Sequence, residues 1–326
     1  MPNKQTLAAA AEIRQEVRRL RISAEDAGRR LDNFVASELK GVPRGHLYRL
    51  LRTGQVRVNG GRRGADYRLV AGDELRLPPV RIAERTQSVG PLKRVSAVLV
   101  AGILYEDAAL LVVAKPSGLP VHGGSGLDGG LIEALRTLRA EPGLELVHRL
   151  DRDTSGCILI ARRKSALRTL HAAFRTGDVE KQYLALLVGR IEREFVSSAP
   201  LRRYVKRGGE RHVAVADDGR AAVTHFRPLA PGADTTLVVV EPDTGRTHQI
   251  RVHAAHAGHP VAGDPRYGDK TANRALKAAG LTRLALHAAR ISFSHPQTGV
   301  RHVVEAPLPA DLERIIGRLT NGGTRN

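Results

Sequence analysis

The stretch LELVHRLDRDTSGCILIARR, residues 144–163, places an apolar run on each side of nine mostly polar residues, 148–156. Short apolar runs bounded by polar residues predict a strand, a loop and a second strand. Within the loop, Asp151 and Asp153 have arginine neighbours, and a nearby positive charge keeps a carboxylate ionised. An ionised carboxylate is suited to act as a nucleophile or a base. The same charges are also typical of a structural salt-bridge loop, so this stretch alone leaves both interpretations open.

The pattern of strands continues on both sides of this loop. Residues 101–115 predict a strand, a turn and a second strand, and more strands and a helix are predicted within residues 180–190, 222–229, 235–242 and 248–258. No GxGxxG or GxxxxGK[ST] motif follows a predicted strand, which argues against a dinucleotide or Walker-type phosphate site. Cys157 is the only cysteine. The histidines of the C-terminal half have no zinc-site spacing: His248, His253, His256 and His259. These patterns therefore predict no metal site, no dinucleotide site and no Walker-type phosphate site.

The N-terminal part has a different pattern. Residues 29–40 and 43–54 predict two helices, the first with apolar side chains recurring on one face and the second rich in arginine. After them, QVRVNG alternates and then turns at Asn59-Gly60, which is typical of a hairpin. We expect a small folded unit over residues 21–80. It is preceded by an N-terminal extension over 1–20, for which disorder is one expectation, and followed by a flexible linker over 81–100 with Gly90-Pro91 at its centre.

The chain is strongly basic. Its 326 residues include 52 Lys+Arg and 33 Asp+Glu, a formal net charge of +19, and the first 95 residues hold 20 of the basic and 10 of the acidic side chains. This concentration indicates a polyanionic partner for the N-terminal part, although a solvated helix also carries charges. No apolar run approaches the ~18 residues of a membrane span, and the N-terminus lacks a signal peptide pattern. We expect a cytoplasmic protein without a membrane partner.

Two sets of motifs resemble known families. The order R-L-D, basic helix, V-x-V-N-G, G-D-x-L over residues 30–75 resembles the S4 RNA-binding domain. The loop H-R-L-D-x-x-T-S-G resembles the signature of the RluA-like pseudouridine synthases, and further motifs of that family follow the same order: Lys115-Pro116-Ser117-Gly118, Lys181-Gln182-Tyr183, Thr244–His253 and Gly263–Gly268. The resemblance extends over residues 100–310. The catalytic loop of protein kinases has the similar motif H-R-D-L. The order here is H-R-L-D, which argues against a kinase.

The resemblance implies an α+β fold: a small N-terminal S4 (ααβ) domain and a larger synthase domain over 101–320, whose mixed, mainly antiparallel sheet is flanked by helices and loops. It also implies roles for side chains. Asp151 would be the catalytic carboxylate, Tyr183 would stack on the flipped uracil, and Arg251 would pair with Asp151. Substrate contacts are assigned to Arg149, Ile250 and His148, and RNA contacts to Arg30, Arg44, Arg49, Arg52 and Arg57.

Without the resemblance, Tyr183 would be interpreted as a core tyrosine and Arg251 as a surface arginine. With it, the expected activity is the isomerisation of uridines in large-subunit (23S) ribosomal RNA, by base flipping and without a cofactor. Two alternatives stay open: a related synthase acting on other ribosomal or transfer RNA uridines, and a non-catalytic RNA-binding or ribosome-assembly protein. We expect a monomer with no obligate protein partner.

Overall fold

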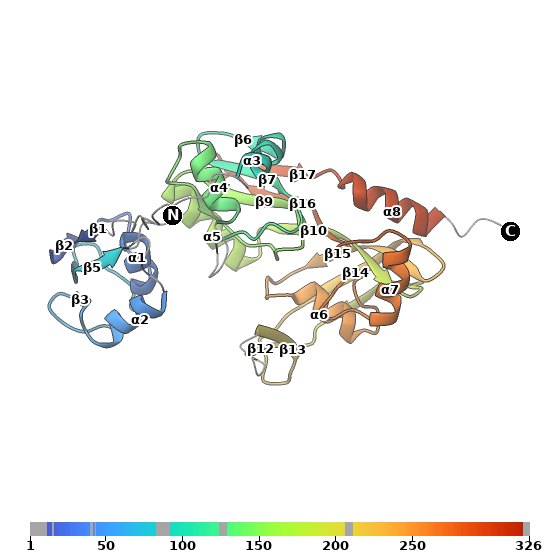
Figure 1. The fold of residues 1–326 in the computed structure, drawn as a ribbon, viewed down its shortest axis with the longest axis horizontal. Helices are drawn as coiled ribbons and strands as arrows, with labels where there is room; N and C mark the ends of the chain where they lie inside the picture. Colours follow the sequence, from blue (N-terminus) through green and yellow to red (C-terminus); the bar gives the residue numbers. More distant parts are fainter. Residues whose placement is uncertain are drawn as a thin grey trace, which may run out of the picture. The chain divides into compact units, whose positions relative to one another are not determined.

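The computed structural model describes residues 12–14, 16–39, 42, 44–82, 92–123, 129–205 and 211–321. The chain forms two compact units, residues 1–88 and 89–326, which are drawn in Figure 1. Within the described ranges, no helix is long and apolar enough to cross a membrane.

The N-terminal unit packs two helices against a small antiparallel sheet. The sheet has the strand order β2-β4-β3. Two other strands, β1 and β5, pair with each other in a separate antiparallel ladder. The elements are β1 (Glu12–Arg14), β2 (Arg18–Arg21), α1 (Leu31–Glu38), α2 (Arg44–Arg52), β3 (Arg57–Val58), β4 (Glu74–Leu77) and β5 (Val80–Ile82).

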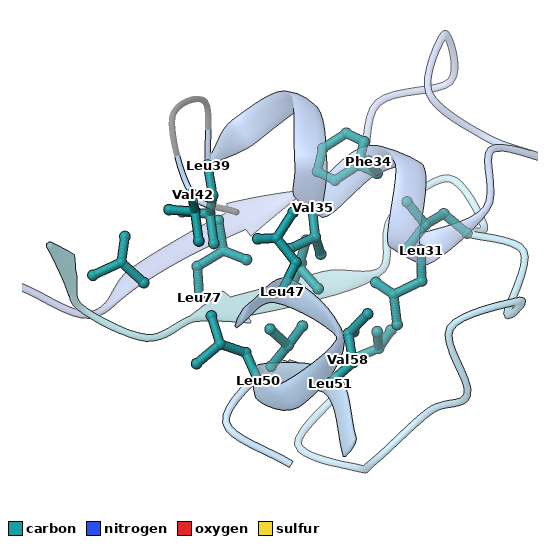
Figure 2. Close-up of a cluster of buried hydrophobic side chains, with 14 of the residues drawn as sticks. Leu31, Phe34, Val35, Leu39, Val42, Leu47, Leu50, Leu51, Val58 and Leu77 are labelled. Carbon is teal, nitrogen blue, oxygen red and sulfur yellow. The ribbon is translucent and has the colours of Figure 1, made fainter. Parts of the chain in front are cut away.

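Apolar residues at helical spacing build the core of this unit. Leu31, Phe34 and Val35 of α1 face Leu47 and Leu50 of α2, and all five are buried, as Figure 2 shows. Burying each such side chain contributes about 1.5–3 kcal/mol. The helices predicted over residues 29–40 and 43–54 are therefore confirmed, and the polar face of α2 remains turned to solvent.

The predicted turn at Asn59-Gly60 is also confirmed. Both residues have positive φ, 51° and 76°, as a two-residue hairpin turn requires. Val58 and Gly61 exchange backbone hydrogen bonds of 3.0 Å across it. The Asn59 side chain donates to Asp73 Oδ1 at 2.8 Å, which attaches the turn to the start of β4.

The structure differs from the expected boundaries. Residues 1–11 lie outside the described ranges, but β2 begins inside the expected extension over 1–20, at Arg18, and pairs with β4. Its sequence RRLR has one apolar residue, so backbone hydrogen bonds rather than a hydrophobic pattern place it. The expected linker over 81–100 is also partly regular, because α3 spans Leu92–Ala101 and buries Leu99 fully. Residues 83–91 lie outside the described ranges.

The second unit is built on one large sheet. Ten strands of the described residues form it: eight follow the path β11-β14-β15-β10-β16-β9-β7-β6, β17 pairs with β16, and β8 pairs with β9. All described pairs are antiparallel except β9 with β16, so the expected mixed, mainly antiparallel sheet is confirmed. The strands are β6 (Ile103–Glu106), β7 (Leu110–Lys115), β8 (Glu145–Leu146), β9 (Ser155–Ala161), β10 (Glu180–Val188), β11 (Phe195–Ser197), β14 (Thr224–Pro231), β15 (Thr235–Pro242), β16 (Leu286–Ser294) and β17 (Arg301–Glu305).

Both faces of the sheet are covered around β7 and β9. Alternate residues of a strand point to opposite faces, and in β7 Leu110 packs with Leu170 of α5 while Leu111 packs with Leu131 of α4. Two-sided burial explains why these strands are continuous apolar runs. The helices of this unit are α3, α4 (Leu131–Leu138), α5 (Lys164–Thr176), α6 (Gln249–His256), α7 (Lys270–Ala278) and α8 (Ala310–Asn321).

Two further strands form a hairpin that is separate from the large sheet. They are β12 (Leu201–Val205) and β13 (Arg211–Val215), which pair with each other and lie beside α6 in Figure 1.

Candidate active site

A pocket of about 720 Å³ opens in the second unit where four chain segments meet. They are the loop before β9, the end of α5, the start of β10 and the connection from β15 into α6. Asp151, Tyr183, Ile250 and Arg251 line the same pocket, so the structure brings together all four of these sequence-predicted side chains. They come from positions up to 100 residues apart in the chain.

Asp151 lies in a loop in which three consecutive backbone carbonyls accept hydrogen bonds. Its carbonyl oxygen accepts from the Thr154 N–H at 3.2 Å. The next two carbonyls are also bound: Lys115 Nζ donates to Arg152 O at 2.8 Å, and Ser117 Oγ donates to Asp153 O at 2.7 Å. With these anchors, the Asp151 carboxylate keeps 17% of its side-chain surface exposed, toward the pocket.

Arg251 is shared between two carboxylates. Its Nε and Nη2 donate to Asp264 at 2.7 and 2.8 Å, and its Nη1 donates to Asp151 Oδ2 at 3.1 Å. Burial opposes the charge of Arg251, but hydrogen bonds and attraction from Asp264 and then Asp151 raise its pKa above the usual value. The expected contact between Arg251 and Asp151 is therefore present, with Asp264 orienting the guanidinium.

Tyr183 and Ile250 form apolar surface beside this pair. Tyr183 lies on β10 opposite Ala288 and Val240. Burial, with the Asp151 charge as a second cause, raises the pKa of its phenol well above the usual value, so the hydroxyl is neutral. Ile250 belongs to the adjacent core cluster and also lines the pocket. A flat aromatic ring and an aliphatic side chain can enclose a planar base.

His148 and Arg149 line the pocket in different ways. The His148 ring stacks on Phe174, with 4.9 Å between ring centroids, and its Nε2 accepts from the Leu159 N–H at 3.0 Å. Burial, with the nearby Lys181 charge, lowers the pKa of His148 to about 3, so this ring is neutral and anchored. Arg149 is exposed, and no ion pair with another described residue holds it.

Asp153, the other carboxylate of the loop, has a separate partner. Arg152 Nε and Nη2 donate to it at 3.0 and 3.3 Å, and this pair lies on the outer side of the loop with Arg152 63% exposed. Exposed pairs contribute about 0–1 kcal/mol. The two interpretations of the loop therefore apply to different residues: Asp153 takes part in a surface ion pair, and Asp151 lies in the pocket.

The arginines expected to contact RNA differ in their surroundings. Arg49 and Arg52 are exposed on α2. Arg30 is paired with Asp32 through Nε and Nη2 at 3.1 and 2.9 Å. Arg57 donates to the carbonyls of Gly54 and Gly60 at 3.2 and 3.1 Å and so supports the hairpin turn. The side chain of Arg44 lies outside what the structure describes.

Sequence reasoning assigned no role to two groups next to the loop. Asp264 was visible only as part of the Gly263–Gly268 motif. Lys115 ends β7, is 1% exposed, and donates to the carbonyls of Pro116, Leu119 and Arg152 at 2.8–2.9 Å. Burial lowers its pKa to about 7. The sequence signal for a role of Lys115 was its position at the end of an apolar strand. A charged side chain buried there must be stabilised by hydrogen-bond partners.

A mixed sheet bearing a pocket with one carboxylate, one tyrosine and one shared arginine, together with a basic two-helix unit, defines an RNA-modifying enzyme. The family model for RNA pseudouridylate synthase matches residues 109–256, and that for the S4 domain matches residues 29–75. The chain belongs to the RNA pseudouridylate synthase family and is an isomerase.

Relatives cover nearly the whole chain. The protein is similar to "Ribosomal large subunit pseudouridine synthase C" of Escherichia coli strain K12, with 51% identity over 92% of this chain and 96% of the relative. It is also similar to the protein of the same name from Pasteurella multocida, with 48% identity over 96% and 97%.

Solved structures agree with this family. "Human RNA Pseudouridylate Synthase Domain Containing 4" superposes with a TM-score of 0.57 at 27% identity and covers 70% of this chain and 97% of its own. "Human RNA Pseudouridylate Synthase Domain Containing 1" gives 0.55 at 30% identity, covering 66% and 86%.

Proposed function

We propose that this enzyme isomerises specific uridines of large-subunit ribosomal RNA to pseudouridine, as the names of its relatives indicate for those proteins. The observation that carries this proposal is the contact of Arg251 with Asp151, 3.1 Å inside a pocket that Tyr183 also lines. A binding protein for a polyanion has no use for a carboxylate held in a pocket, because that charge repels phosphate.

The reaction is balanced without any co-reactant. The C1′–N1 bond of uridine breaks, the uracil turns, and a C1′–C5 bond forms. The hydrogen on C5 leaves as a proton, and N1 regains one, so nothing is oxidised or reduced. The anomeric carbon gains positive character during cleavage, as in glycoside hydrolysis. We assign Asp151 to this carbon, with Arg251 orienting the carboxylate through the hydrogen bond from its Nη1.

The base must leave its stack to reach Asp151. Flipping costs a few kcal/mol, and stacking on an aromatic ring offsets about 1–3 kcal/mol of that. We assign this stacking to Tyr183, with Ile250 on the pocket wall and His148 as a fixed neutral ring beside it. Arg149, exposed at the pocket, is assigned to the RNA and to the space that the flipped nucleotide leaves.

The S4 domain is assigned to RNA affinity. Arginine suits phosphate because its planar fork donates two parallel hydrogen bonds. Arg49 and Arg52 are exposed for such contacts, whereas Arg30 and Arg57 have protein partners and are assigned to orienting the RNA-facing surface. Arg44 begins α2 and is assigned with them. We further propose that the protein works as a monomer in the cytoplasm, where its RNA substrate is made.

Mapping of pseudouridine in the RNA of a gene-deletion strain tests the substrate. Sites in large-subunit ribosomal RNA should be lost in the deletion strain, restored by the wild-type gene and not restored by an Asp151→Asn gene. Losses confined to other ribosomal RNA or to transfer RNA would contradict the substrate. Unchanged maps, with a defect in ribosome assembly that Asp151→Asn repairs, would favour the non-catalytic alternative.

A further inference from the structure

Tyr267 contacts two parts of the second unit through its hydroxyl oxygen and Arg251 through its ring. The Val213 N–H of β13 donates to its hydroxyl oxygen at 3.1 Å. On the other side, the same oxygen lies 2.8 Å from His248 Nδ1. The Tyr267 ring also lies under the Arg251 guanidinium, 5.1 Å from its centre. The tyrosine therefore contacts the hairpin β12–β13, the start of α6 and the arginine that holds Asp151.

These contacts define the state of the His248 ring. The Tyr267 oxygen accepts from the Val213 N–H, and we place its own proton toward His248 Nδ1, which lies 2.8 Å away. A neutral imidazole that accepts at one nitrogen carries its proton on the other. We therefore assign a proton to Nε2 of His248. That nitrogen lies 3.8 Å from Asp151 Oδ2, on the oxygen that Arg251 also contacts.

The backbone of His248 is unusual. It has φ 55° and ψ 17°, in the left-handed region, which is uncommon and strained for a residue other than glycine. The following residue holds this conformation, because Gln249 Oε1 accepts from Thr244 Oγ1 and from the Arg246 N–H at 2.7 and 2.9 Å. Backbone strain of this kind concentrates at functional sites. Here it directs the His248 ring between Tyr267 and Asp151.

We propose that Tyr267 and His248 are positioning residues of the isomerisation. Tyr267 fixes the His248 ring so that its Nε2 lies 3.8 Å from Oδ2 of Asp151, beside the Arg251 guanidinium that donates to the same oxygen. The bond to Val213 connects the hairpin β12–β13 to this arrangement. The inference rests on the proposed function, since positioning requires a reaction at Asp151.

The kinetics of three variants test the proposal. Tyr267→Phe keeps the ring under Arg251 and removes the hydroxyl. His248→Asn keeps a residue type that tolerates the left-handed region and removes the ring. Because displacement of a reacting group by about 1 Å reduces rates by about 100-fold, we expect each to lower kcat by about 10-fold or more while KM and RNA affinity change less than about twofold. The double variant should be no slower than the slower single variant, because both act on one path.

Tyr105→Phe is the matched control. Like Tyr267→Phe, it removes a partly buried, hydrogen-bonded tyrosine hydroxyl, in this case one that donates to Asp107 at 2.8 Å. Tyr105 does not line the pocket, so this variant should keep the wild-type kcat. Thermal unfolding of each variant sets an assay temperature at which all are folded. Wild-type kcat in Tyr267→Phe, a loss confined to KM, or multiplied losses in the double variant would each overturn the proposal. Inactive wild-type and Tyr105→Phe proteins would instead contradict the proposed function, and the inference with it.

Discussion

Asp264 accepts hydrogen bonds from both Nε and Nη2 of Arg251, at 2.7 and 2.8 Å. Nη1 of the same guanidinium donates to Asp151 Oδ2 at 3.1 Å. The carboxylate of Asp264 is fully buried, so this two-pronged contact fixes the plane of the guanidinium. The orientation of the arginine toward the pocket is thus determined by a residue outside it.

Arg251→Lys should lower kcat at least 100-fold with RNA affinity within about threefold of the wild type. A lysine ammonium carries the charge but has no fork, so it cannot bind Asp264 at two points and still reach Asp151. Turnover and filter binding on the same RNA measure the two effects. A variant that loses affinity and keeps kcat would make Arg251 a phosphate contact instead.

Asp264→Asn should destabilise the protein by about 3–5 kcal/mol, because removing one partner of a buried pair leaves the other charge poorly compensated. Denaturant unfolding measures this. Asp311→Asn is the control: its carboxylate is 57% exposed and lies 3.6 Å from Arg283, so we expect a change below about 1 kcal/mol. Similar values for the two variants would contradict the role given to Asp264.

His148→Gln should reduce the dependence of stability on pH below neutrality. The folded protein holds the pKa of His148 at about 3, below the usual value of about 6.5. Between these values the unfolded state binds more protons, so the wild type loses stability as pH falls through this window. Glutamine keeps an acceptor for the Leu159 N–H but does not titrate. Unfolding midpoints at pH 7 and 5 should lie closer together in the variant; an unchanged difference would contradict a neutral His148.

Arg49→Ala combined with Arg52→Ala should weaken RNA binding and reduce its salt dependence. Removing one arginine–phosphate interaction lowers the slope of log affinity against log salt by about 0.7–0.9, so the slope of the double variant should fall by up to about 1.8. Arg30→Ala should change the slope less, because Asp32 already neutralises that guanidinium. Equal slopes for the wild type and the double variant would exclude the polar face of α2 from the RNA interface.

The predictable features were those with a local pattern. Continuous apolar runs around residues 148–156 predicted the strands on both sides of the Asp151 loop, and apolar residues at helical spacing predicted α1 and α2. The strand β2 carries a single leucine and is held by backbone bonds to β4, 53 or more residues away in the chain, so no local pattern marks it.

Long-range partners were equally beyond local patterns. The motif that contains Tyr267 was recognised, but the contacts of its hydroxyl with Val213 and His248 exist only after the chain folds. The same holds for Asp264, which lies 13 residues from Arg251 on a different segment. Sequence spacing along one element predicts neighbours on that element, whereas these contacts depend on how separate elements pack.

The most direct test of the central claim compares Asp151→Asn with Asp153→Asn in single turnover on ribosomal RNA carrying tritium at uridine C5. Formation of the C1′–C5 bond releases that tritium. We predict no release by Asp151→Asn at wild-type RNA affinity, and near wild-type release by Asp153→Asn, whose carboxylate pairs with Arg152 at the surface. Tritium release by Asp151→Asn at the wild-type rate would contradict the catalytic role of this carboxylate.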